Sequence, residues 1–119
     1  MSVDGTSPTK MLEDDAYALT EAAVAMSQAL EKKDDRALAD ALDRNLHLWV
    51  AIRTLVSKEE NKLPKEVKDN LIQLSHYAAQ KTFEMRDGFA TDSVESLIHT
   101  NLQIAEGLLE GKERAERQQ

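Results

Sequence analysis

The sequence is poor in the residues that cross-link or break small folds. It contains no cysteine, two prolines and four glycines among 119 residues. The absence of cysteine excludes disulfide scaffolds and thiolate metal sites, although it fits either redox compartment. The few prolines and glycines, together with 41% hydrophobic and 31% charged residues, favour one folded helical domain over a disordered chain.

Long apolar runs and basic surfaces are also missing. No apolar run approaches the ~18 residues of a membrane span, and the start, MSVDGTSPTKMLEDD, lacks the basic and apolar regions of a signal peptide. We therefore expect a cytoplasmic protein that does not contact the membrane. The net charge is −7 and no basic face stands out, so we expect no direct binding to nucleic acid.

Catalytic and ligand-binding patterns are absent from the sequence. The histidines are His47, His76 and His99, and none has a metal-binding spacing to another histidine or to a carboxylate. The chain has no nucleophile motif and no glycine-rich phosphate loop. We therefore expect no enzyme, no metal and no cofactor.

Apolar residues recur at helical spacing in four segments. The first is predicted from Pro8, capped by Ser7, to about Leu30. The second is predicted from about Arg36 to Val56, and the third from Pro64 to near Asp87 with Gly88 as its C′ residue. The fourth follows a capping box formed by Asp92 and Glu95. The predicted fold is an all-α, four-helix-bundle-like single domain over residues 1–119, with flexible ends at 1–6 and 112–119.

The second predicted helix is the centre of the expected bundle. Its apolar face covers more than half of its circumference and carries Trp49, the only tryptophan. Trp49 is interpreted as core, with a partner contact as the alternative, and Asn45 as a satisfied buried amide. The first predicted helix buries mainly alanines, so we expect it to be docked more weakly than the others and to shift when a groove opens.

Two other features leave alternatives open. Asn101 lies in the apolar stripe of the last helix, where it either bonds the backbone of a neighbouring helix or contacts a ligand. The third helix carries a second stripe of Ile72, His76, Ala79 and Phe83, which is either more core or an exposed contact face.

Four pieces of sequence together resemble one family. They are LW at 48–49, EENKLP at 59–64, a leucine-rich helix from Val67, and LIHTNLQIAEGL at 97–108. In this order and spacing they resemble the FlaF family of flagellar biosynthesis regulators, over about residues 37–109. The matching motif positions are Trp49, Asn61, Leu63, Pro64, Asn101, Gly107 and Leu108. In physical terms, Asn61 suits a turn bonded to the backbone, and Gly107 is interpreted as permitting close helix packing.

The resemblance implies an all-helical, non-enzymatic protein that binds flagellin and acts alongside a second regulator, FlbT. Our leading hypothesis is a chaperone-like adaptor that takes up flagellin in a helical groove and couples its synthesis and export to assembly. The alternatives are post-transcriptional control of flagellin mRNA together with FlbT, and a structural dimerisation module. The candidate partner-binding residues are Leu19, Met26, Ile72, His76, Ala79 and Phe83.

Overall fold

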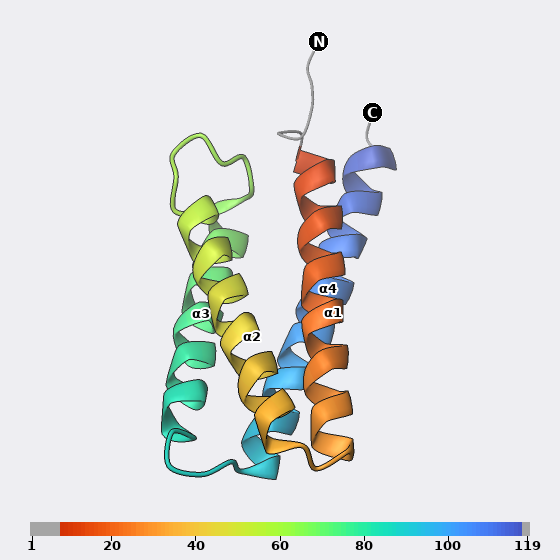
Figure 1. Cartoon of the computed structure of the whole chain (residues 1–119). Coiled ribbons are helices and arrows are strands. Elements are labelled where there is room, and N and C mark those ends of the chain that lie inside the picture. Colours follow the sequence, from red (N-terminus) through yellow and green to blue (C-terminus); the bar gives the residue numbers. More distant parts are fainter. Residues whose placement is uncertain (1–7, 118–119) are drawn as a thin grey trace.

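The computed structural model describes residues 8–117, with side chains for residues 13–114 and 116–117. The chain forms four helices, α1 (Pro8–Glu31), α2 (Asp35–Val56), α3 (Lys65–Glu84) and α4 (Thr91–Arg117). Consecutive helices run in opposite directions, as Figure 1 shows. The predicted all-α four-helix bundle is confirmed, in a body of 47 × 24 × 21 Å.

The four helices are arranged as two antiparallel pairs. Helix α1 packs along α4, and α2 packs along α3, while α1 also packs against α2 and so joins the pairs. Helices α3 and α4 hardly touch each other. In Figure 1, α2 lies beside α1 near the turn that connects them and diverges from it toward the other end. The bundle is therefore splayed at the end that carries the loop between α2 and α3.

The expectation that the first helix is weakly docked is wrong. Helix α1 contacts both α4 and α2, and its Ala16 and Ala23 are each 1% exposed. Alanines bury little area, but their small side chains allow two helices to pack closely along their length. The least enclosed helix is instead α3, which packs mainly against α2 alone.

The turn between α1 and α2 contains a strained residue. Lys33 has φ 55°, and within the described range it is the one non-glycine residue with a positive φ. Its N–H donates to Leu30 O at 3.1 Å, and the N–H of Asp34 donates to Ala29 O at 3.1 Å. This is a Schellman motif, which usually places glycine at the position that Lys33 occupies. Asp34 then caps α2 by accepting from the N–H of Ala37 at 3.1 Å.

We expect Lys33→Gly to stabilise the protein by about 0.5–1 kcal/mol. A left-handed conformation costs a residue with a Cβ about 1–2 kcal/mol, and glycine removes this cost. Part of the gain is offset because glycine loses more conformational entropy on folding. Urea unfolding followed by circular dichroism measures the change. Lys32→Gly is the matched control, since the φ of Lys32 is not positive. A lower unfolding free energy for Lys33→Gly than for the wild type would contradict the strain argument.

Both predicted ends of α3 differ from the observed ones. Helix α3 begins one residue later than predicted, after Pro64, and ends at Glu84 rather than near Asp87. Gly88 is not the predicted left-handed C′ residue, since no described glycine has a positive φ. The chain after α3 instead continues in turns, in which Met85 N–H donates to Thr82 O at 3.2 Å and Gly88 N–H donates to Met85 O at 3.2 Å.

Helix α4 is longer than predicted at both ends. Asp92 lies inside its first turn, and the carbonyl of Ala90 accepts from Val94 N–H at 3.1 Å, so the predicted capping box at Asp92 is wrong. Residues 112–117, predicted to be flexible, continue the helix. Lys112 stabilises them through Glu116 at 3.1 Å and Glu13 of α1 at 3.8 Å. Residues 1–6, Ser7 and 118–119 lie outside the described residues.

Candidate functional site: an open groove between α3 and α4

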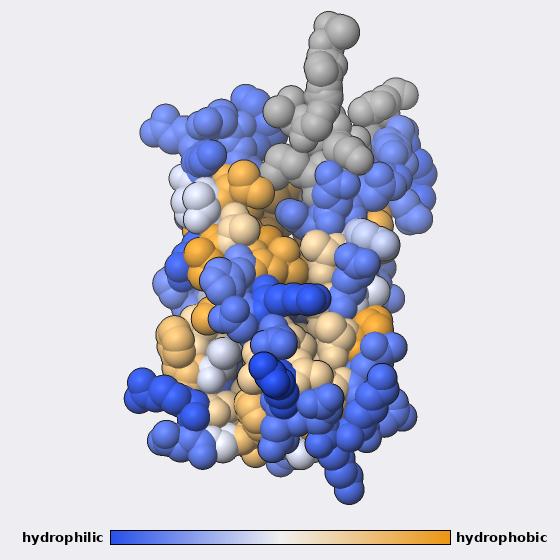
Figure 2. Space-filling view, viewed as in Figure 1, coloured by the Kyte–Doolittle hydropathy of each residue, from blue (hydrophilic) through white to orange (hydrophobic). Residues whose placement is uncertain are grey.

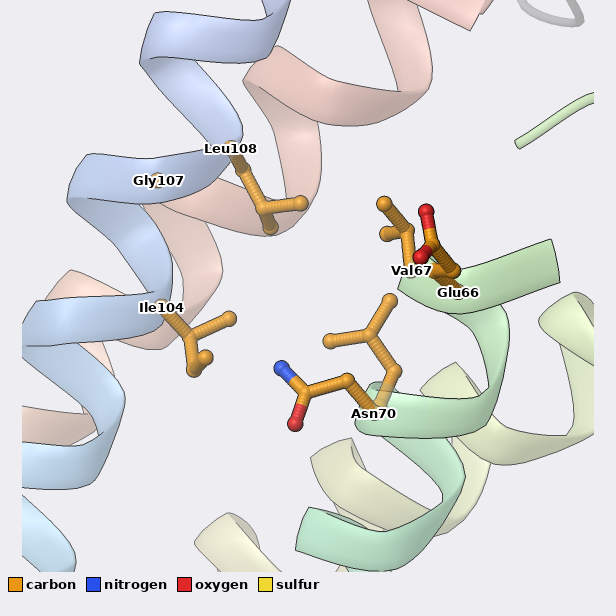
Figure 3. A pocket seen from close by; sticks show the side chains of 7 residues that line it. Glu66, Val67, Asn70, Ile104, Gly107 and Leu108 are labelled. Atoms are coloured by element: carbon orange, nitrogen blue, oxygen red, sulfur yellow. The ribbon is translucent and has the colours of Figure 1, made fainter. Parts of the chain in front are cut away.

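A groove opens between the first half of α3 and the second half of α4. It has a volume of about 390 Å³. Figure 3 shows Val67 and Asn70 of α3 facing Ile104 and Leu108 of α4 across open space. The described residues that line the groove are Glu66, Val67, Asn70, Leu71, Ile104, Gly107 and Leu108.

The groove is open at one end of the α3–α4 boundary and closed at the other. Near the 85–90 connection, the hydroxyls of Tyr77 on α3 and Ser96 on α4 are hydrogen-bonded to each other. Lys81 Nζ lies 5.8 Å from the centre of the Tyr77 ring, a cation–π contact that supports this tyrosine. The two helices separate from there toward the loop at 57–64, and the groove lies in that region.

The lining of the groove is mainly apolar and has a polar edge. Leu71 and Leu108 form its floor and are 2% and 6% exposed. Val67 and Ile104 are half-buried, while Asn70 and Glu66 are exposed. Of the seven described lining residues, Glu66 alone carries a charge. The groove therefore suits apolar side chains whose flanks are polar or basic.

The separation of the two helix pairs is also visible on the face formed by α1 and α2. Figure 2 shows apolar atoms gathered in the upper half, between the positions of α2 and α1 in Figure 1, with hydrophilic atoms on either side. Separation of the two helix pairs at this end thus exposes apolar surface on both sides of the bundle. Exposed apolar surface of this kind often marks a site for a partner.

A buried amide network fixes the helices below the groove. Asn101 of α4 accepts from Trp49 Nε1 of α2 at 3.0 Å. Its Nδ2 donates to Leu19 O of α1 at 3.1 Å and to Asn45 Oδ1 of α2 at 2.8 Å. Trp49, Asn45 and Asn101 are each 0% exposed. Asn101 therefore makes the predicted bond to a neighbouring backbone and is closed to a ligand in this conformation, and Trp49 belongs to the core.

The side-chain amide of Asn45 has only some of its hydrogen bonds, contrary to the expectation that it is fully satisfied. Its Oδ1 accepts from Asn101, but its buried Nδ2 has no hydrogen-bond partner among the described residues. An unpaired buried donor costs about 1–3 kcal/mol. The bond to Asn101 therefore compensates for only part of the cost of burying this amide.

The family-motif positions are mostly structural. Asn61 Oδ1 accepts from Leu63 N–H at 3.0 Å, which confirms the predicted turn, and Pro64 precedes the first residue of α3. Leu108 forms part of the groove floor. The interpretation of Gly107 as a close-packing residue is wrong for this chain, because a Cβ at Gly107 would meet nothing within 4 Å.

The predicted partner-binding residues are not brought together. Leu19 and Met26 are each 0% exposed and belong to the core, so they do not form a contact surface in this conformation. On α3, Ile72 and Ala79 are half-buried and His76 is exposed. The guanidinium of Arg53 on α2 donates to His76 Nδ1 at 3.2 Å. None of these residues lines the α3–α4 groove.

Phe83 is 63% exposed and borders a second hollow between α2 and α3 that also includes Phe89. The groove residues that sequence reasoning missed are Glu66, Asn70 and Ile104. One feature of the sequence indicates the groove: Ile104 lies one turn from Gly107, at the edge of the apolar face of α4, where a glycine leaves its neighbours uncovered.

A half-buried carboxyl on α1 is the strongest electrostatic feature. Burial, and secondarily the charge of Asp14, raises the pKa of Asp15 from 3.8 to about 6. A raised carboxyl pKa means that the folded state holds the proton more tightly than the unfolded state. The contribution of Asp15 to stability is therefore most favourable below pH 3.8 and is lost as the pH rises through about 6.

Asp15→Asn is therefore expected to stabilise the protein at pH 7.5 by about 1–2 kcal/mol, after allowance for solvent screening. The gain over the wild type should shrink steadily as the pH falls from 7 to about 4. Urea unfolding at a series of pH values measures it. Asp40→Asn, which removes one charge at an exposed position of α2, is the control. A gain that does not change with pH would contradict the assigned pKa.

Within 8–117, no three His, Asp or Glu side chains come together in a way that could hold a metal ion. None of the helices in that range is both long enough and apolar enough to cross a membrane.

Comparisons with known proteins give one match. The family described as "Flagellar protein FlaF" matches residues 4–108. No curated protein and no solved structure matched the chain. The matched range covers all of α1, α2 and α3, most of α4, and all of the groove-lining residues. The chain therefore belongs to the family of the flagellar protein FlaF.

Proposed function

We propose that this protein binds flagellin in the groove between α3 and α4 and acts as a chaperone-like adaptor in the cytoplasm, without enzymatic activity. The observation that carries the proposal is the open apolar groove itself. Two helices that hardly touch leave Val67, Leu71, Ile104 and Leu108 facing a space of about 390 Å³. Membership of the FlaF family supports a role connected with the flagellum.

The size of the groove fits part of an amphipathic helix. A helical turn is 5.4 Å long and about 10 Å across, so the inner halves of about two turns occupy a volume close to the 390 Å³ of the groove. An amphipathic helix can place its apolar side chains in such a groove and leave its polar face in water. We propose that a terminal flagellin segment binds in this way and is kept soluble and unassembled until export.

Coupling to flagellin synthesis follows if free and flagellin-bound forms have different partners. The hollow at Phe83 and Phe89 is a second exposed surface, separate from the groove. Three acids border it, Asp35, Asp43 and Asp87, against one basic residue, Arg86. This acidic balance disfavours flagellin mRNA there and favours a protein partner such as FlbT.

Calorimetric titration of the protein with monomeric flagellin tests the proposal. We expect saturable heat with a stoichiometry near one-to-one. Absence of heat with the protein fully folded would contradict flagellin binding. The same titration with FlbT, and with flagellin mRNA at two salt concentrations, then distinguishes the two alternative partners, since phosphate contacts weaken as salt rises.

A further inference from the structure

The groove contains one place where the backbone of α4 is bare. Gly107 lines the groove, is exposed and lies well inside α4. A Cβ built at this position meets nothing within 4 Å. Nothing in the described chain therefore requires glycine there, although glycine is unfavourable in the middle of a helix.

A second glycine lies one turn further along α4. Gly111 follows Gly107 by four residues, so both glycines lie on the same face of α4. Two glycines at this spacing let a second helix approach more closely than the ~8–10 Å usual for helices separated by side chains. Helix α3 does not use this possibility, because it hardly touches α4.

The charge of the groove limits what can occupy it. Glu66 is the only charge among its described lining residues, and the chain as a whole carries −7. An acidic flank favours a basic partner and repels another copy of this acidic chain. The apolar floor at Leu71 and Leu108 requires an apolar stripe on that partner.

We propose that Gly107 is the crossing point at which the bound helix packs directly on the backbone of α4. The occupant is an amphipathic helix with a small residue at the crossing and basic residues beside its apolar stripe. This inference rests on the proposed binding of flagellin and specifies the contact within the same groove. Gly107 is then a residue that weakens the free helix and sets which helices can bind.

Two variants test the crossing. Gly107→Ala adds a methyl group in open space, so the urea midpoint of the free protein should rise while the affinity for monomeric flagellin falls at least tenfold. Gly107→Leu should reduce the affinity at least a hundredfold with the free protein still folded. Gly88→Leu is the matched control for flagellin binding, because Gly88 also meets nothing within 4 Å, has no positive φ and lies outside the groove, at the separate hollow of Phe83 and Phe89.

The outcomes distinguish the proposed binding of flagellin from the proposed helix crossing at Gly107. Binding of flagellin by the wild type, with Gly107→Leu weakened and Gly88→Leu unchanged, supports the crossing. Equal affinity of wild type, Gly107→Leu and Gly88→Leu would overturn the crossing and leave flagellin binding intact. No binding of flagellin by the folded wild type would overturn both. A loss shared equally by Gly107→Leu and Gly88→Leu would also overturn the special role of Gly107.

Discussion

Asn101→Asp should destabilise the fold by about 3–5 kcal/mol at neutral pH, the largest loss of stability that we expect from a near-isosteric change. The new carboxylate can still accept from Trp49 Nε1. Its second oxygen would replace the Nδ2 that now donates to Leu19 O at 3.1 Å and Asn45 Oδ1 at 2.8 Å. A buried negative charge would then face two oxygens, and the one remaining donor, Trp49 Nε1, would not compensate for its desolvation.

Urea unfolding by circular dichroism measures this loss, with Trp49 fluorescence as a second probe. Lowering the pH should narrow the gap to the wild type, because the carboxyl group of the variant, once protonated, can donate to one of the two facing oxygens. Gln103→Glu is the matched control, since it makes the same amide-to-acid change at an exposed position two residues away. A loss at Asn101→Asp no larger than at Gln103→Glu would contradict the role assigned to the network.

Ile104→Lys should weaken binding of flagellin by at least a hundredfold, or about 2.7 kcal/mol. Ile104 is half-buried on the wall of the groove, so a lysine there can extend its ammonium group into the free space without unfolding the protein. In the complex, that ammonium group would have to be desolvated against an apolar helix face. It would also repel the basic flanks expected of the partner.

Leu102→Lys is the control for this experiment. Leu102 is 41% exposed on α4 and does not line the groove, so the variant adds the same charge to the same helix. We expect its affinity for flagellin to stay within a few-fold of the wild type. Equal weakening by both variants would indicate a general charge effect, and no weakening by Ile104→Lys would remove the groove from the binding surface.

The helices could be predicted from the sequence because their apolar spacing is regular, and Trp49 on a broad apolar face correctly placed α2 against two neighbours. The interhelical arrangement could not be predicted in the same way. The small area that the alanines of α1 can bury predicts weak docking, but buried area does not include how closely two helices approach each other. In the structure these alanines lie against α4 and α2, and α3 is the peripheral helix.

A helical groove could be predicted from the sequence, but the position of the groove between α3 and α4 could not. A helical groove was expected, but beside α1 or on the second stripe of α3. Hydrophobic periodicity identifies which face of a helix is apolar, but it does not reveal which neighbour fails to cover it. Val67 and Ile104 look like ordinary core residues in the sequence, and they line a groove because α3 and α4 separate beyond Tyr77 and Ser96.

Asn101, in contrast to Val67 and Ile104, could be recognised from the sequence as an unusual residue. The sequence alone identified a polar residue in an apolar stripe, and the structure supplies its partners on α1 and α2. This network lies where α1, α2 and α4 meet and does not involve α3. It therefore holds these three helices in register through side-chain hydrogen bonds.

Hydrogen–deuterium exchange of the protein with and without monomeric flagellin tests the central claim most directly. If flagellin binds in the groove, protection should increase at residues 66–71 of α3 and 104–108 of α4. Amides around Tyr17 and Val24, which are exposed on α1, should exchange at the same rate in both samples. Tight binding with unchanged exchange along the groove, or with protection confined to α1 or to the hollow at Phe83, would contradict the proposal.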